Sequence, residues 1–217
     1  MKFVPITLLA TLSPILAGEW PEWGGDPSKN MISRESDLPA EFAPGEENDD
    51  GRIAPDTGTN CKWVVQLGSE SYGTPTIAGG RVLVGTNNES PRDPAITGDR
   101  GVVMSFEEAS GAFQWQFTRP KLPGGDDVDW QYLGICSSAL LHKDRGYILT
   151  NRGEVAALDL STGQPAWSFD MIGTLGVVPH NITSSSVVRR GNTIFATTSN
   201  GVDGEHGHTA SPESPAL

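Results

Sequence analysis

The sequence predicts an all-β protein built from repeated units of about four short strands. Three observations carry this prediction. Tryptophan recurs every 52 residues, at Trp63, Trp115 and Trp167. The 26 glycines and 16 prolines are typical of a turn-rich β protein. Short runs of β-branched residues lie between the turns. A fixed period of this length indicates stacked or radially arranged units, here the blades of a β-propeller.

The residues around the tryptophans repeat at the same offset, so that the stretch 100–117 aligns with 152–169. In both copies a glycine stands four residues before the tryptophan. A residue without a side chain at this point leaves room for the indole ring to lie over the turn. The residues that we expect to have this structural role are Trp63, Trp115, Trp167, Gly101, Gly153, Gly111 and Gly163.

Strands are expected in the same order in each unit. In the first unit they cover 63–67, 76–78, 81–87 and 101–106, with Gly79 and Gly80 as a hairpin turn. The strand 114–117 is taken to open the second unit, which continues with 137–141, 147–151, 152–158 and 167–169. The third unit has 184–188 and 193–198. An asparagine follows the same strand in every unit, at Asn87, Asn151 and Asn200.

The third unit has no closing Thr-Gly turn and no closing tryptophan within the 217 residues. Propellers have about four to eight blades, and ring closure covers the terminal faces. We therefore expect residues 61–217 to form about two and a half to three blades at the N-terminal end of a ring that continues beyond residue 217. A short open solenoid is the alternative.

The first 18 residues have the layout of a secretory signal peptide, because one lysine precedes an apolar run that ends in small residues. A buried N-terminal strand is the alternative. The run is too short to be a membrane span, and no other stretch is long enough to be a transmembrane segment. A secreted or periplasmic location follows. Residues 19–60 form an arm whose Trp20 and Trp23 are expected to pin it against the propeller.

Charge and cysteine content narrow the function classes. The formal net charge of −12 argues against nucleic acid as a partner, because nucleic acids are bound through clustered Lys and Arg. The only two cysteines are Cys61 and Cys136, and export would permit a disulfide between them. Cys136 stands in an apolar run, where a buried and inert thiol is the commoner role.

Several polar groups are candidate sites, and each has a plainer interpretation. His206 and His208, with Asp203 and Glu205 nearby, could bind a metal but are more often simply exposed. Acidic residues at 126–129 and at 46–50 could bind calcium, or could be solvated loops. His180 could line the channel, or could be a hydrogen-bonded structural residue. The long loops 88–99, 118–132 and 202–217 are the best surfaces for a ligand or partner.

The stretch 156–167 resembles the repeat of pyrroloquinoline-quinone (PQQ) β-propellers, with an Ala-Leu-Asp strand, a Thr-Gly turn and a tryptophan; 105–115 is a looser copy. The segments 20–25, 62–69, 98–102, 134–138 and 198–203 are similar to large secreted PQQ-binding-like repeat proteins of planctomycete-type bacteria. The resemblance implies a quinoprotein-type propeller in which the tryptophan of one blade docks between neighbouring blades.

The resemblance also implies two function classes, because this fold carries several. One is a binding or assembly scaffold without catalysis, like the outer-membrane assembly lipoproteins with this repeat. The other is a PQQ- and calcium-dependent dehydrogenase of alcohols or sugars. Such dehydrogenases hold the quinone beneath a disulfide of adjacent cysteines, whereas Cys61 and Cys136 are far apart in sequence. We assign no catalytic, cofactor-binding or metal residue and expect the scaffold, with an unknown protein or small-molecule ligand at the loops. The dehydrogenase, with key residues partly beyond residue 217, is the alternative.

Overall fold

A computed structural model of the chain describes residues 18–33, 35–54, 57–126, 128–180, 185–202, 205 and 207–217. The expected signal peptide lies outside these ranges except for Gly18, and it stays a prediction. Among the helices of the described residues, none is long and apolar enough to cross a membrane.

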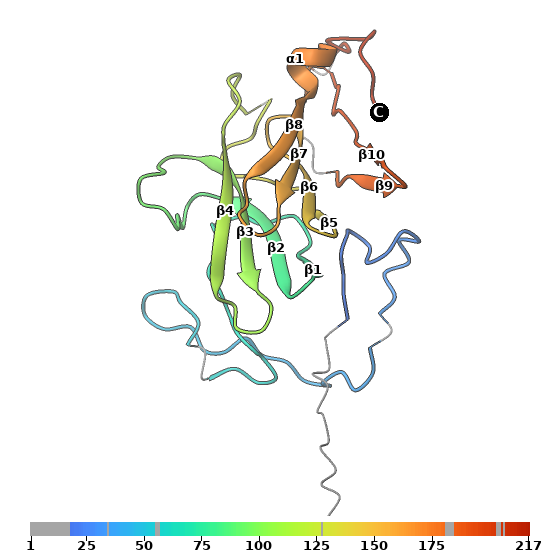
Figure 1. Cartoon of the computed structure of the whole chain (residues 1–217). Coiled ribbons are helices and arrows are strands. Elements are labelled where there is room, and N and C mark those ends of the chain that lie inside the picture. Colours follow the sequence, from blue (N-terminus) through green and yellow to red (C-terminus); the bar gives the residue numbers. More distant parts are fainter. Residues whose placement is uncertain are drawn as a thin grey trace, which may run out of the picture.

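Two four-stranded antiparallel sheets form the body of the protein, and each is a simple meander (Figure 1). The first sheet contains β1 (Thr76–Ala78), β2 (Arg81–Asn87), β3 (Arg100–Glu107) and β4 (Phe113–Pro120). The second contains β5 (Leu140–His142), β6 (Arg145–Leu149), β7 (Glu154–Asp159) and β8 (Pro165–Asp170). A short helix α1 (Met171–Leu175) and the hairpin of β9 (Val188–Arg190) and β10 (Thr193–Phe195) follow. The prediction of four-stranded units in an all-β protein is confirmed.

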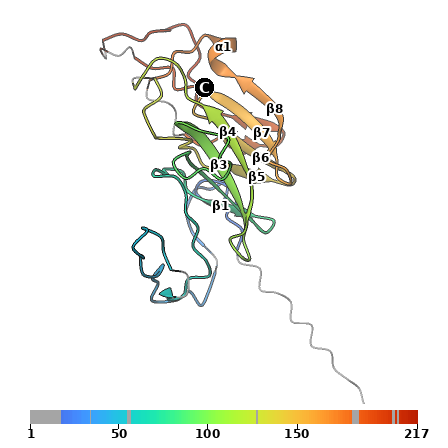
Figure 2. The ribbon, with the colours of Figure 1, turned by 90° about the vertical axis from the view of Figure 1, so that its left-hand side faces the viewer.

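The two sheets pack against each other, with the first strands β1 and β5 in contact (Figure 2). Alternate residues of a strand point to opposite faces of its sheet. Leu83 of β2 accordingly joins the core cluster that both sheets share, while the next residue, Val84, joins a cluster on the other face of the first sheet. Val65 and Leu67 cover that other face. A third cluster, around Leu149, lies between the second sheet, α1 and the β9–β10 hairpin.

The tryptophan-bearing strands end a sheet and do not begin one, which corrects the expected grouping. β4, which contains Trp115, pairs with β3 of the first sheet. The segment 63–67 was expected to be a strand but has no strand structure. Its counterparts β4 and β8 each pair with the third strand of their sheet. The described residues before it make only isolated bridges, at Trp20–Ile77, Ala43–Thr59 and Glu47–Ile53. Without a neighbouring strand, the segment forms no ladder of backbone hydrogen bonds. The carbonyl oxygen of Gln66 instead accepts from the Arg92 side chain at 2.5 Å.

The indoles of Trp63 and Trp115 each lie on a turn of the following repeat, and not on the turn just before them in sequence. Gly111 and Gly163 have left-handed φ angles of 72° and 71° in the β3–β4 and β7–β8 turns. A Cβ built on Gly111 would lie 2.7 Å from Cδ2 of Trp63, and one on Gly163 would lie 2.4 Å from Cε3 of Trp115. The expectation that a glycine makes room for the tryptophan four residues later is therefore wrong, because the ring that fills the space comes from the preceding repeat.

Hydrogen bonds repeat the same pattern. Nε1 of Trp63 donates to the carbonyl oxygen of Glu108 at 2.8 Å, and Nε1 of Trp115 donates to that of Leu160 at 2.9 Å. In both cases the acceptor stands three residues before the turn glycine. Trp167 differs, because its side chain is 45% exposed and its ring lies beside Tyr147, with centroids 6.1 Å apart.

Gly101 and Gly153, which align in sequence, have different roles. Gly101 lies within β3, where a Cβ would come within 2.2 Å of the Asn151 side-chain oxygen. Gly153 lies in the turn before β7, with a left-handed φ of 63°. One glycine therefore gives space to a neighbouring side chain, whereas the other allows a turn conformation that side chains disfavour.

The arm contacts the first strand of all three units. Trp20 exchanges backbone hydrogen bonds of 2.8 and 2.9 Å with Ile77 of β1. The carbonyl oxygen of Pro21 accepts from the backbone N–H of Leu141 in β5 at 2.7 Å, and Arg190 of β9 donates to Pro27 O at 3.3 Å. Trp23 is 46% exposed, and the pinning role expected of it stays a prediction.

Candidate loop-face binding surface

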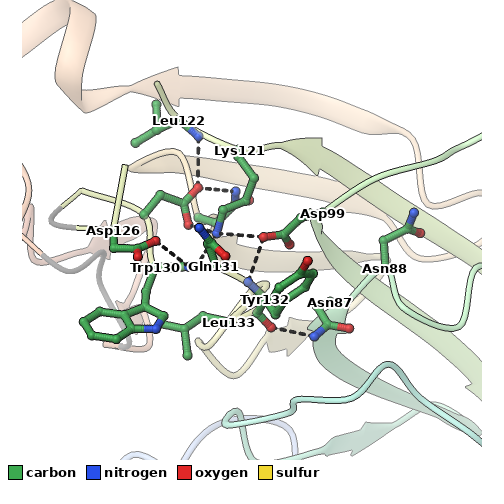
Figure 3. Close-up of polar contacts among 12 residues, drawn as sticks. Asn87, Asn88, Asp99, Lys121, Leu122, Asp126, Trp130, Gln131, Tyr132 and Leu133 are labelled. Atoms are coloured by element: carbon green, nitrogen blue, oxygen red, sulfur yellow. Dashed lines mark hydrogen bonds and ion pairs between the residues drawn. The ribbon is translucent and has the colours of Figure 1, made fainter. Parts of the chain in front are cut away.

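One end of both sheets carries the long loops, and buried polar side chains fix the loop that follows β4. We call this end the loop face and define it by the loops 88–99, 118–132 and 202–217. Asn87 stands at the end of β2 (Figure 3). Its Nδ2 donates to the carbonyl oxygen of Tyr132 at 2.5 Å and to Ser69 Oγ at 2.8 Å. Its Oδ1 accepts from the backbone N–H of Ser69 and of Glu89, both at 3.1 Å. The amide of Asn87 thus ties together three segments that are distant in sequence.

A second anchor lies under the same loop. The side chain of Asp129 is completely buried, and its Oδ2 accepts from Leu122 N at 2.9 Å and from Asn151 Nδ2 at 3.0 Å. Its Oδ1 contacts the Lys121 ammonium, which also lies 3.7 Å from Asp99 Oδ2. Asp99 in turn accepts from the backbone N–H of Tyr132 at 2.7 Å. A buried charge is tolerated only when it is paired and hydrogen-bonded in this way, so the network holds the loop in one conformation.

The loop presents two aromatic side chains above this network. Trp130 is 51% exposed and Tyr132 is 44% exposed. Tyr132 has a left-handed φ of 61°, a conformation that persists where the surroundings determine it strongly. Tryptophan and tyrosine are the residues most often found at the centre of protein-binding surfaces, where rigid placement reduces the entropy cost of binding. The arrangement is therefore suited to recognition.

The asparagine of the third unit has the same function as the other two. Asn200 Oδ1 accepts from the backbone N–H of Val178 at 3.0 Å, and its Nδ2 donates to the carbonyl oxygen of Ser211 at 2.7 Å. The Asn that recurs after the second strand of each unit is thus a repeated loop anchor. The sequence showed the recurrence but gave no signal of this role.

The candidate metal sites lie only partly within the described residues. Asp203, His206 and Asp127 lie outside the described residues. Within the described ranges no three His, Cys, Asp or Glu side chains are grouped as metal ligands would be. Asp126 Oδ1 accepts from the backbone N–H of Gln131 at 3.3 Å. In the acidic segment 46–50, Asn48 caps a turn by accepting from the backbone N–H of Asp50 and Arg52.

His180 and the cysteines also have structural surroundings. His180 is half-buried, and its backbone N–H donates to Ser199 O at 3.3 Å. Cys61 and Cys136 are both free thiols. Burial, with a smaller effect of the Asp129 carboxylate, raises the pKa of Cys136 from 9.0 to about 11. Its thiol is therefore protonated and weakly nucleophilic at neutral pH, as predicted for a buried cysteine.

The sequence model of one protein family matches residues 51–210, and this family is described as outer membrane protein assembly factor BamB. The chain belongs to this family. It is thus a PQQ-like repeat protein, as the repeat 156–167 indicated. A comparison with curated proteins returns no match.

Several solved structures are similar to this chain over part of their length. The quinohemoprotein alcohol dehydrogenase of Comamonas testosteroni is 15% identical, with a TM-score of 0.47, over 78% of this chain and 22% of its own. BamB of Moraxella catarrhalis is 19% identical, with a TM-score of 0.40, over 68% of this chain and 51% of its own. A quinohemoprotein alcohol dehydrogenase of Pseudomonas putida HK5 is 17% identical, with a TM-score of 0.39, over 60% of this chain and 17% of its own. The chain of this BamB-family protein thus spans about half the length of BamB of Moraxella catarrhalis and about a fifth of the length of each of the two dehydrogenases.

The described residues of this BamB-family protein do not fit a quinone with calcium. A quinone site beneath a disulfide needs two cysteines side by side, whereas Cys61 and Cys136 are free and separate. The grouped acidic ligands that calcium prefers are also not found within the described ranges.

Proposed function

We propose that this BamB-family protein is a binding and assembly scaffold of the cell envelope that holds a protein partner on its loop face. The observation that carries the proposal is the aromatic pair Trp130 and Tyr132, displayed on a loop that buried Asp129 and Asn87 fix from below. The family description, an assembly factor for outer membrane proteins, supports the same class. A secreted or periplasmic location, through the signal peptide expected at 1–18, is part of the proposal.

The partner that fits this surface is a protein and not a polyanion. The net charge of −12 disfavours nucleic acid and other anions. The exposed indole and phenol supply large apolar area with hydrogen-bonding groups, which is the composition of a protein-binding hot spot. A planctomycete-type origin remains a prediction from the resemblance.

Photo-cross-linking in cells tests the proposal. Gln131 is exposed between the two aromatic residues and is the position for a photoreactive amino acid. Ser161, exposed in the β7–β8 turn at the opposite end of the sheet, is the matched control. We expect a discrete protein adduct from position 131, none from 161, and loss of the adduct in Trp130→Ala. Equal adducts from both positions, or none from 131, would contradict the proposal.

The dehydrogenase remains the alternative, with PQQ and calcium as its cofactors. Its test is separate, because it requires binding of PQQ in the presence of calcium and reduction of a dye in the presence of an alcohol or sugar. Dye reduction that depends on both cofactors would favour the alternative over the scaffold.

A further inference from the structure

A cavity of about 420 Å³ lies between the arm and the segments that lead into the first strands of three units. The arm contributes Trp23 and Lys29 to its wall. Residues 72–74 precede β1, Cys136 and Ser138 precede β5, and Ser185, Ser186 and Val188 belong to the third unit. Its size is within the usual range of small-molecule sites. The cavity is distinct from the exposed pair at Trp130 and Tyr132, neither of which lines it.

Two aromatic side chains line the wall. Trp23 and Tyr72 are 46% and 60% exposed. Trp23 lies next to Glu22, which is buried and paired with Lys29. Lys29 Nζ also donates to the carbonyl oxygen of Trp23 at 2.9 Å. The position of Trp23 is therefore defined, although its ring is not covered.

The wall also has hydroxyl groups, but it presents little charge. Thr74, Ser138 and Ser186 line the cavity, and the backbone N–H of Ser138 donates to Ser186 Oγ at 2.9 Å. Among the described residues of the wall, Lys29 is the one cation, and it is paired with Glu22. The neighbouring carboxylate of Glu70 raises the pKa of the Tyr72 phenol, which therefore stays protonated. The Cys136 thiol is protonated too, because burial raises its pKa to about 11.

Apolar ring faces beside hydroxyl groups, without an unpaired charge, fit one class of ligand well. A pyranose ring has a face of C–H groups that packs on an indole or phenol, and a rim of hydroxyls that exchange hydrogen bonds with serine and threonine. A charged sugar or a phosphate would find no unpaired charge among the described wall residues, and its desolvation would disfavour binding. We propose that this cavity binds a neutral saccharide and that Trp23 of the arm forms its stacking platform.

Ligand-observed saturation-transfer NMR on the full chain tests the proposal. The probes are three neutral disaccharides, cellobiose, maltose and N,N′-diacetylchitobiose, with glucuronate as the anionic comparison. We expect transfer to the C–H protons of at least one neutral disaccharide, and none to glucuronate. No transfer to any of the three at millimolar concentration would overturn the proposal, as would transfer to glucuronate as strong as to the neutral sugars.

Two variants tie binding to the cavity. Trp23→Ala removes the platform, and we expect affinity to fall by roughly tenfold, a loss that is common for a tryptophan contact. Trp167→Ala is the matched control, because Trp167 is 45% exposed, close to the 46% of Trp23, but does not line the cavity. Both substitutions are at exposed positions, and circular dichroism checks that both variants fold. Equal affinity of Trp23→Ala and the unaltered protein would overturn the proposal. The saccharide test is independent of the Gln131 cross-link, so either proposal can fail alone.

Discussion

The contact between Gly163 and Trp115 supports a quantitative prediction for Gly163→Ala. The left-handed φ of 71° costs an alanine about 1–2 kcal/mol. The added methyl group would also stand 2.4 Å from Cε3 and 2.6 Å from Cδ2 of a buried ring. Trp115 is only 8% exposed and cannot move aside freely, so overpacking adds about 1–3 kcal/mol. We expect the free energy of unfolding to fall by about 2–5 kcal/mol in total.

Gly79→Ala is the matched control for backbone strain. Gly79 also has a left-handed φ, 57°, but a Cβ at this position meets nothing within 4 Å. In Gly79→Ala the free energy of unfolding should therefore fall only by the cost of the left-handed backbone conformation, about 1–2 kcal/mol. Urea unfolding, followed by circular dichroism, measures both variants. Equal losses in Gly163→Ala and Gly79→Ala would refute the proposed ring contact.

A double-mutant cycle isolates the contact itself. Trp115→Ala removes a buried indole and should cost about 3–5 kcal/mol. In that background Gly163→Ala meets no ring, so its cost should drop to that of Gly79→Ala. If Trp115→Ala does not fold, Gly111 and Trp63 offer an equivalent cycle, because Trp63 is only half-buried and the approach of 2.7 Å is less severe. Additive losses in the cycle would argue against direct contact.

Three further predictions concern the loop anchors and the buried thiol. Asp129→Ala should lower the free energy of unfolding by about 2–3 kcal/mol, because it removes hydrogen bonds to a charged group. It should also speed hydrogen exchange at the Leu122 amide, and unchanged exchange there would contradict the anchoring role of Asp129. In urea unfolding, Asn151→Asp should lower the free energy of unfolding more than Asn151→Ala does, because a second carboxylate would face Asp129 across 3.0 Å. A larger loss in Asn151→Ala would argue against the contact between Asn151 and Asp129. Burial raises the folded-state pKa of Cys136 from 9.0 to about 11, so the contribution of its thiol to the free energy of unfolding is complete below pH 9 and is lost as pH rises through 11. In Cys136→Ala this loss of stability at alkaline pH should be smaller, and an identical dependence of the free energy of unfolding on pH would contradict the burial of the thiol.

The period of 52 residues was sufficient to predict the repeated four-stranded units, because hydrophobic strands and turn glycines recur with it. The same period could not identify which ring meets which turn. A glycine that precedes one tryptophan by four residues also follows another by 48, as Gly163 does relative to Trp167 and Trp115. Only the packing of the sheets distinguishes the two pairings, and it selects the ring of the preceding repeat.

The loop face was predicted only in outline. The length of the segment 118–132 indicated a surface loop, and its acidic residues suggested either a cation or solvent. The structure instead buries Asp129 beneath the loop, where Lys121 and Asn151 satisfy it. Lys121 is eight residues away in sequence and Asn151 is 22, so no local pattern links the three. Contacts of this kind depend on how the sheets pack, which a single sequence does not show.

The central structural claim is that the ring of one repeat is held on the turn of the next, and indole N–H exchange tests it most directly. Trp63 and Trp115 donate hydrogen bonds to the backbone carbonyls of Glu108 and Leu160, whereas Trp167 is partly exposed beside Tyr147. We expect the indole N–H of Trp63 and Trp115 to exchange slowly with deuterated solvent in NMR spectra, with Trp115 the slower of the two. Fast exchange at both residues would contradict the account.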